Sequence, residues 1–171
     1  MRFFLLFFLL YSPNIFSSSN SEFIDLISNC SNKIQKTYAL DKSIPLELVL
    51  AQAIIESNWG KSRFAIEGNN FFGMRTWNSD EPQLKPLKNK NAKFGLKVYE
   101  TPCASVQDYL INLNNSEKYQ NLRNIRDLEI KLWGKVDPKV LAKGLVNYSE
   151  EKNKYIRKVI KKIEILQSQI N

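Results

Sequence analysis

The stretch LELVLAQAIIESNWG, residues 46–60, predicts a buried helix around which the rest of the chain is organised. Residues 48–55 are apolar on nearly all sides of a helical projection, and a helix of that kind belongs inside a core. The flanking residues suggest its limits. We expect a helix from Leu46 to Trp59, with Ser43 as its cap, Pro45 in its first turn and Gly60 as its C-terminal stop.

Glu56 is the single carboxylate in residues 53–65, and it lies in the last turn of this predicted helix. The helix dipole is negative there, and the neighbouring side chains are apolar or aromatic, so both effects raise the pKa of the carboxyl group. An acid that keeps its proton near neutral pH is what glycoside cleavage needs to protonate a leaving oxygen. The alternative is an ordinary solvated glutamate near a helix end. Gln52 lies four residues earlier and shares the same helix face.

The remaining pattern indicates a helical body with a small inserted β lobe. Short β-like runs occur at 74–77 and 94–99, and a polar stretch separates them. The fold class is therefore expected to be α+β, mostly α, with a β-hairpin lobe and one domain over residues 21–171. The other helices are expected at 21–39, 62–66, 104–114, 116–122, 138–145 and 150–169.

The composition limits the chemistry that this chain can perform. There is no histidine among the 171 residues, which excludes a Ser-His-Asp triad, a Cys-His pair and an HExxH zinc site. Acid–base chemistry must come from carboxylates, Lys, Tyr or Cys, and no metal or cofactor is expected. Cys30 and Cys103 leave two alternatives open, which are one disulfide in an oxidising compartment and two buried free thiols.

The charge balance favours anionic partners. Lys and Arg number 25 against 17 Asp and Glu, for a net charge of +8. Such a charge suits nucleic acid, anionic lipid or an acidic polymer, although a coding bias towards lysine explains it equally well. No nucleic-acid-binding motif is present, so nucleic acid is not expected as a partner.

The N-terminus is typical of a secretory signal peptide spanning residues 1–20. MRFFLLFFLLY, residues 1–11, joins one Arg to an apolar run, and SSSNS, residues 17–21, follows. The apolar run is shorter than the roughly 20 residues of a membrane span, and a retained anchor is the lesser alternative. We expect cleavage near Ser17–Ser21, export to the periplasm or cell envelope, and no stable membrane span afterwards.

Three blocks of sequence, in this order, resemble a known family. They are AQAIIESNWGKSRFA (51–65), GNNFFG (68–73) and GLVNYSEEKNKYIRKVIKKI (144–163). Together they resemble the Bax-type proteins among the peptidoglycan β-N-acetylglucosaminidases of glycoside hydrolase family 73, related to the glucosaminidase domain of flagellar rod hydrolases. The resemblance covers residues 40–166 and implies a lysozyme-like helical domain.

The resemblance also implies functional residues. Glu56 matches the catalytic acid of the family, and Tyr148 matches a tyrosine that lies near that acid across the cleft. Asn70 and Phe71 match the loop that lines the sugar groove, although turn chemistry and burial are equally good explanations for them. From the residue types alone, Trp59 and Trp77 are candidates for stacking on sugar rings. Gln52 completes the predicted substrate-binding set.

The match lacks one group. The family places a second carboxylate in the β lobe, but residues 82–99 contain no Asp or Glu. Asp80, Glu81 and Glu100 are the nearest candidates, and each is equally explained as an ordinary solvated carboxylate. Of these, Asp80 or Glu81 could swing over the cleft. Alternatively, the acetamido group of the substrate acts as nucleophile, or the enzyme is weak or inactive. Five lysines of the lobe, Lys85, Lys88, Lys90, Lys93 and Lys97, either attract an acidic polymer or keep an exposed loop soluble.

The leading prediction is a monomeric, exported endo-β-N-acetylglucosaminidase that cleaves the glycan backbone of peptidoglycan. A lytic transglycosylase on a similar fold is the second prediction, because it needs one acid and no activated water. A non-catalytic wall-binding protein is the third.

Overall fold

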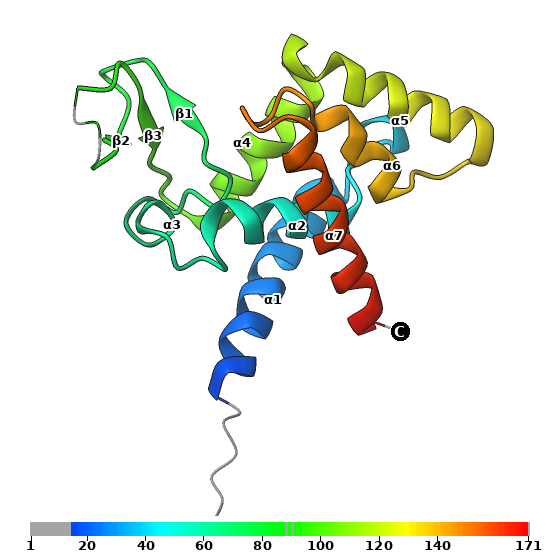
Figure 1. Cartoon of the computed structure of the whole chain (residues 1–171), viewed down its shortest axis with the longest axis horizontal. Coiled ribbons are helices and arrows are strands. Elements are labelled where there is room, and N and C mark those ends of the chain that lie inside the picture. The colour runs from blue at the N-terminus through cyan, green and yellow to red at the C-terminus, as the bar shows by residue number, and fades with distance from the viewer. Residues whose placement is uncertain (1–14, 88, 90, 171) are drawn as a thin grey trace, which may run out of the picture.

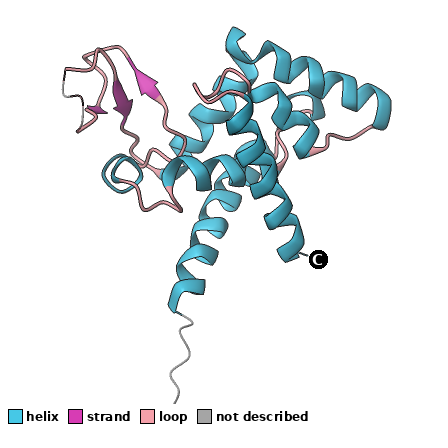
Figure 2. Cartoon of the chain, viewed as in Figure 1, coloured by secondary structure: helices cyan, strands magenta, loops and turns pink. Residues whose placement is uncertain are grey.

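The computed structural model describes residues 15–87, 89 and 91–170 of the chain. In this part, the protein is a helical body that carries a small sheet on one side (Figures 1 and 2), which confirms the predicted fold class. The α-helices are α1 (Ile15–Gln35), α2 (Leu46–Ser57), α3 (Arg63–Gly68), α4 (Pro102–Asn115), α5 (Gln120–Trp133), α6 (Pro138–Ala142) and α7 (Asn153–Ile170). The 3₁₀ helices are η1 (Leu40–Lys42), η2 (Glu117–Tyr119) and η3 (Lys143–Leu145). The strands are β1 (Arg75–Thr76), β2 (Gln83–Leu84) and β3 (Gly95–Lys97).

Helix α2 is the buried centre of the body, as its sequence predicts. It packs against α1, α6 and α7, and Leu48, Val49, Ala51 and Ala53 are fully buried. Because neighbours surround α2, an apolar side chain is stabilised at almost every position along it. The polar residues on α2 are therefore the best candidates on this helix for a functional role.

Both ends of α2 differ from the expectation. Ser43 does not cap the helix, because Pro45 occupies the N-cap position and no side chain caps it. The side chain of Gln35 instead accepts a hydrogen bond from the amide of Ile44 at 2.6 Å. At the other end, the helix stops at Ser57 rather than Trp59, with Asn58 as a left-handed C-cap at φ 51°.

The turn after α2 is strained. Asn58, Trp59 and Gly60 have φ of 51°, 60° and 73°, and left-handed backbone costs a non-glycine residue about 1–2 kcal/mol. Ser57 holds the turn, since its hydroxyl donates to Ala53 O at 2.6 Å and accepts from the Gly60 amide at 2.8 Å. A methyl group at position 60 would lie 2.9 Å from the ring of Phe23, so this position needs glycine for space as well as for φ.

The β lobe is a three-stranded antiparallel sheet of order β1-β3-β2, rather than the expected hairpin. Strands β1 and β3 fall inside the two predicted β-like runs and pair through Arg75 with Leu96. Strand β2 comes from the polar stretch between those runs and pairs through Leu84 with Leu96. The sequence did not reveal β2 because two residues are too few to show alternation.

Helix α5 continues well beyond the predicted end at residue 122. It packs against α6 and η3, and its buried side holds Leu122 and the charged Arg126. By contrast, Leu128, Leu132 and Trp133 are exposed. A buried charge interrupts the apolar stripe, so helical periodicity is hard to recognise in this segment.

A disulfide joins Cys30 of α1 to Cys103 at the start of α4, with the two Cα atoms 4.9 Å apart. This resolves the alternative left open by the sequence in favour of a bridge. None of the described helices is long and apolar enough to cross a membrane. The apolar run of the predicted signal peptide lies outside the described residues, and Ser17–Ser21 lie in α1, so cleavage there stays a prediction.

Candidate active site

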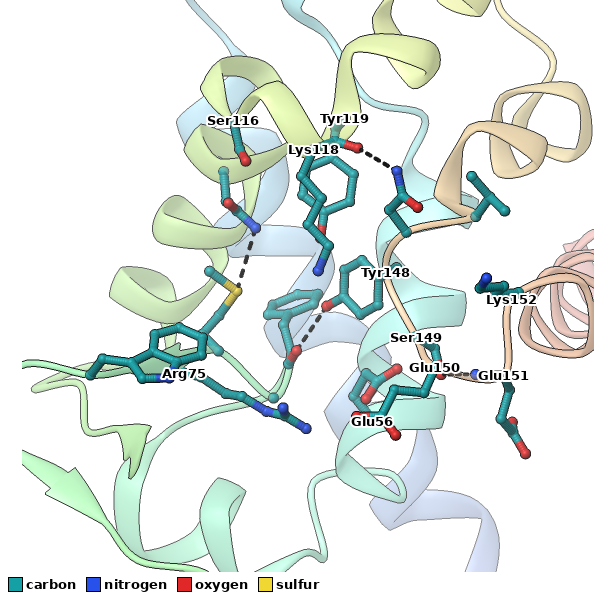
Figure 3. A pocket seen from close by; sticks show the side chains of 17 residues that line it. Glu56, Arg75, Ser116, Lys118, Tyr119, Tyr148, Ser149, Glu150, Glu151 and Lys152 are labelled. Carbon is teal, nitrogen blue, oxygen red and sulfur yellow. Dashed lines mark hydrogen bonds between the residues drawn. The ribbon is translucent and has the colours of Figure 1, made fainter. Parts of the chain in front are cut away.

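A cavity of about 880 Å³ lies between the β lobe and the helical body, and its lining includes the carboxyl-bearing Glu56. Residues 72–75 and Trp77, in and around β1 of the lobe, form one wall, and the segment 146–152 before α7 forms another. Asn112 of α4 and Lys118 and Tyr119 of η2 form a third side (Figure 3). Segments far apart in the sequence therefore meet around Glu56.

Glu56 has the properties of a proton donor. Burial raises the pKa of its carboxyl group above the ordinary value of 4.5. A hydrogen bond with Tyr155 and the charges of Arg75 and Lys158 oppose that rise but do not reverse it. Glycine at position 73 leaves space beside the acid, because a methyl group there would lie 3.4 Å from Glu56 Oε2. The acid is thus partly desolvated yet open to the cavity.

A chain of buried hydrogen bonds leads to Glu56. The Tyr109 hydroxyl donates to Gln52 Oε1 at 2.6 Å, and Gln52 Nε2 donates to the Tyr155 hydroxyl at 2.9 Å. Because the Tyr155 oxygen accepts from an amide, its own proton is free to point at Glu56, with which it is hydrogen bonded. Both polar ends of the Gln52 side chain are thus used, which orients Tyr155 towards the acid.

Tyr148 lines the same cavity as Glu56, on the segment between η3 and α7. Its hydroxyl donates to Phe72 O at 2.8 Å, and its ring stacks on Tyr155 with centroids 5.4 Å apart. Since the proton is committed to a backbone carbonyl, the phenol oxygen can still accept a hydrogen bond from the cavity.

Of the predicted substrate-binding residues, the structure brings only Trp77 into the cavity lining, where its side chain is 68% exposed. Gln52 is fully buried and lies behind the acid instead of beside the sugar space. Trp59 packs against Phe23 and under Lys162, away from the cavity. The strained turn after α2 points this indole at the core, because the helix ends two residues before it.

Asn70 and Phe71 hold the lobe in place and do not line the cavity. Asn70 Nδ2 donates to Met74 O and Lys97 O, both at 2.9 Å, and its Oδ1 accepts from the Met74 amide at 3.0 Å. Phe71 is 5% exposed and packs on Phe23 with centroids 5.8 Å apart. The alternatives of turn chemistry and burial therefore describe these two residues better than sugar contact.

Asp80 and Glu81 are exposed in the turn between β1 and β2, and neither lines the cavity. The carboxylate of Asp80 instead accepts a hydrogen bond within that turn, from the Ser79 hydroxyl at 3.4 Å. The lobe thus brings no carboxylate into the lining, and Glu100 is also absent from it.

The sequence did not predict several of the residues that line the cavity. Arg75 and Lys118 contribute positive charge, and Glu150 and Glu151 contribute carboxylates from the segment before α7. Arg75 lies two residues after the second resembling block, inside the β-like run predicted at 74–77. No group of His, Cys, Asp and Glu suited to a metal ion occurs among the described residues.

The helical domain carries a small sheet, and the acid Glu56 lies in the cavity between them, which is the kind of arrangement that the family resemblance implies. The family model described as "Mannosyl-glycoprotein endo-beta-N-acetylglucosaminidase" matches residues 32–168. The chain belongs to this glucosaminidase family, as the three sequence blocks predict.

Individual relatives agree with this assignment. The chain is 34% identical over 95 residues to the exo-glucosaminidase LytG of Bacillus subtilis, covering 51% of the chain and 32% of that relative. It is 30% identical over 112 residues to the protein Bax of Escherichia coli, covering 66% and 39%. The chain thus spans about a third of the length of these relatives. The truncated glycoside hydrolase domain of Salmonella typhimurium FlgJ has a similar fold, with a TM-score of 0.60 at 21% identity over 87% of this chain and 98% of that one.

Proposed function

We propose that this chain is an exported endo-β-N-acetylglucosaminidase that hydrolyses the glycan backbone of peptidoglycan, with Glu56 as the proton donor. The observation that carries the proposal is a carboxyl group of raised pKa at the end of a buried helix, open to a cavity large enough for sugar rings. Membership of the glucosaminidase family supports the choice of linkage.

Tyr155 and Tyr148 have separate roles in the proposed hydrolysis. The Tyr155 hydroxyl donates to the carboxyl group of Glu56, which leaves the second carboxyl oxygen to carry the proton for the leaving oxygen. The Tyr148 oxygen is placed to accept a hydrogen bond from the sugar or from a water molecule. Trp77 offers an exposed ring on which a sugar can stack.

Hydrolysis also needs a group that activates water or stabilises the cationic transition state. Glu56, Glu150 and Glu151 are the carboxylates that line the cavity in the described part of the chain. Glu151 is bound by Lys154 and Lys158. Glu150 is therefore our candidate for the second carboxylate, and the acetamido group of the substrate is the alternative.

The test is the release of reducing ends from purified sacculi. Glu56→Gln should lower kcat by about 10²–10⁴-fold, because the amide cannot supply a proton. Glu150→Ala should also lower kcat, and azide should restore turnover to this variant but not to Glu56→Gln. Equal turnover by the wild type and Glu56→Gln would contradict the proposal, and full activity of Glu150→Ala would favour the acetamido route.

A lytic transglycosylase is the second candidate, favoured by the absence of any lobe carboxylate from the cavity lining. Mass spectrometry of the digest separates the two reactions. Reducing N-acetylglucosamine ends support hydrolysis, and anhydro-muramic ends support transglycosylation. Binding to sacculi without any released sugar would instead support a non-catalytic wall-binding protein.

Export is supported by the disulfide, since such bridges persist in oxidising compartments. It is also supported by the signal-like N-terminal sequence. N-terminal sequencing of secreted protein should begin near Ser17–Ser21, and a start at Met1 would contradict the signal peptide. We further propose that the exported protein acts as a monomer, which light scattering of the purified protein tests.

A further inference from the structure

Among the described residues, three cations line the cavity without a salt bridge, and two of them, Arg75 and Lys118, lie across it from the carboxylates of Glu150 and Glu151. The charge of Arg75 also acts on Glu56. Arg75 comes from β1 and Lys118 from η2, and both line the cavity that contains Glu56. In the described part of the chain, the ion pairs within 4.0 Å involve Arg63, Lys97, Lys154 and Lys158, and none involves Arg75 or Lys118. Two unpaired cations in one cavity are a natural place for an anion.

Aromatic rings hold both cations in position. The guanidinium of Arg75 lies 4.4 Å from the centre of the Phe94 ring, and Phe94 in turn packs near Trp77. The ammonium of Lys118 lies 5.5 Å from the centre of the Tyr119 ring. Ring faces orient a cation without neutralising it, so the full charge of each residue stays available to a ligand.

The charges in the cavity are separated. Figure 3 shows Arg75 and Lys118 on the side of the lobe and of η2, while Glu150, Glu151 and Lys152 lie on the opposite wall, beyond Glu56. Arg75 is close enough to Lys118 to lower the pKa of its ammonium, after the larger effect of burial. The two cations therefore repel each other, and an anion between them would remove that repulsion.

We propose that Arg75 and Lys118 form a carboxylate-binding subsite, which selects a glycan with an acidic substituent near the bond to be cut over a neutral glycan. This inference rests on the proposed function and specifies its substrate class. Peptidoglycan can present such a carboxylate from its stem peptide or, once the peptide has been removed, from the lactyl ether of muramic acid. Chitin-type chains of N-acetylglucosamine carry no carboxylate.

Binding to the Glu56→Gln protein tests the subsite without turnover. Calorimetry would compare three ligands, namely soluble strands with stem peptides, the same strands after an amidase has removed the peptides, and a chitin oligosaccharide. Adding Arg75→Gln and Lys118→Gln should weaken binding of the acidic strands by about tenfold for each cation removed. The Kd for the chitin oligosaccharide should change by less than about twofold.

Matched variants isolate the subsite from net charge. Lys36→Gln with Lys131→Gln removes the same charge at exposed positions outside the cavity and should leave the selectivity unchanged. Arg75→Lys with Lys118→Arg keeps the charge and should retain most of the binding.

The outcomes are distinct. A stronger loss for peptide-bearing strands assigns the subsite to the stem peptide, and a stronger loss for stripped strands assigns it to the lactyl group. An unchanged Kd for both acidic ligands, or an equal loss for the chitin oligosaccharide, would overturn the inference. Because this test measures binding and not turnover, failure here is separate from failure of the proposed hydrolysis, which wild-type digestion of sacculi reports.

Discussion

Glu56 is placed so that its environment opposes its charge. The carboxyl group ends a buried helix, where the backbone dipole is negative, and burial is the largest cause of its raised pKa. Holding the ionised form in this place destabilises the folded protein, and the Tyr155 hydrogen bond with the charges of Arg75 and Lys158 offsets part of that cost. Catalysis by a protonated acid and stability at high pH therefore make opposite demands on one residue.

This conflict predicts a pH-dependent stability difference. A raised folded-state pKa means that the contribution of Glu56 to stability is complete below its ordinary value of 4.5 and is lost as pH rises through the folded value. Glu56→Gln removes that loss. The Tm of the variant minus the Tm of the wild type should therefore increase from about pH 4 to about pH 8. Thermal melts at both pH values check this. A difference that stays constant with pH would show that Glu56 is not desolvated.

Gln52 illustrates how a buried polar residue can serve a site that it does not touch. Gln52→Met keeps the volume of the side chain but leaves the Tyr109 hydroxyl without its acceptor, so we expect destabilisation of about 1–3 kcal/mol in urea unfolding. Combined with Tyr109→Phe, the loss should be smaller than the sum of the two single losses, because both variants remove the same hydrogen bond. Additive losses would indicate that the two side chains are not coupled.

At the scale of elements, the cavity depends on how the segments around α2 are held. The lobe is joined to the body by the amide of Asn70, and α1 is joined to α4 by the disulfide. Next to the cavity segment 146–152 in sequence, η3 packs against α5 so closely that only glycine fits at position 144. Each of these contacts can be tested away from the catalytic chemistry.

Gly144→Ala should be strongly destabilising. The added methyl group would lie closer than 3.0 Å to Cα, Cβ and N of Leu122, so α5 and η3 must separate. We expect a loss of about 1–3 kcal/mol or more in the free energy of unfolding, measured with urea. Gly134→Ala is the matched control, since its site is open and only its φ of 65° opposes alanine. Gly144 itself has no left-handed φ, so a loss at position 144 no larger than the loss at position 134 would contradict the steric argument.

The Cys30–Cys103 bridge should contribute substantially to stability. It joins residues 73 apart, and closing a loop of that length stabilises the fold by about 4 kcal/mol on the chain-entropy model. The double variant Cys30→Ala, Cys103→Ala should therefore unfold at lower urea than the oxidised wild type. Under full reduction, the wild type should approach the double variant. Identical midpoints in oxidising conditions would show that the bridge does not form in solution.

At the scale of the whole molecule, the net charge of +8 should attract the acidic wall polymer over long distances. The lobe lysines do not contribute equally to this attraction. Lys85 donates to Ala92 O and Phe94 O, and Lys97 pairs with Asp108 at 3.0 Å, so both also have structural partners. Lys93 is exposed, and Lys88 and Lys90 lie outside the described residues.

Binding of Glu56→Gln to sacculi should therefore weaken between about 50 mM and about 500 mM NaCl, because salt screens exposed charges. A pull-down with purified sacculi at both concentrations measures the effect. The chitin oligosaccharide serves as the uncharged control, and its binding should hardly change. Salt-independent binding to sacculi would show that long-range charge attraction does not contribute to that binding.

The sequence by itself determined the buried helix, the class of fold and the acid, because these depend on local periodicity, on the dipole at a helix end and on three blocks that resemble a family. Of the predicted site residues, Glu56, Tyr148 and Trp77 line the cavity in the structure, and their roles stay predictions. The other predicted contacts, such as Gln52 and Asn70, proved to be buried polar residues, and sequence cannot separate burial from binding when both use the same amides.

Only the tertiary structure decided which charges face the acid. Arg75, Lys118 and Glu150 come from three segments that approach one another through packing, and nothing in their local sequence records that distance. The same holds for Gln52, whose partners lie 57 and 103 residues away. Periodicity reports which face of an element is buried, whereas the partners across a cavity depend on how all the elements pack together.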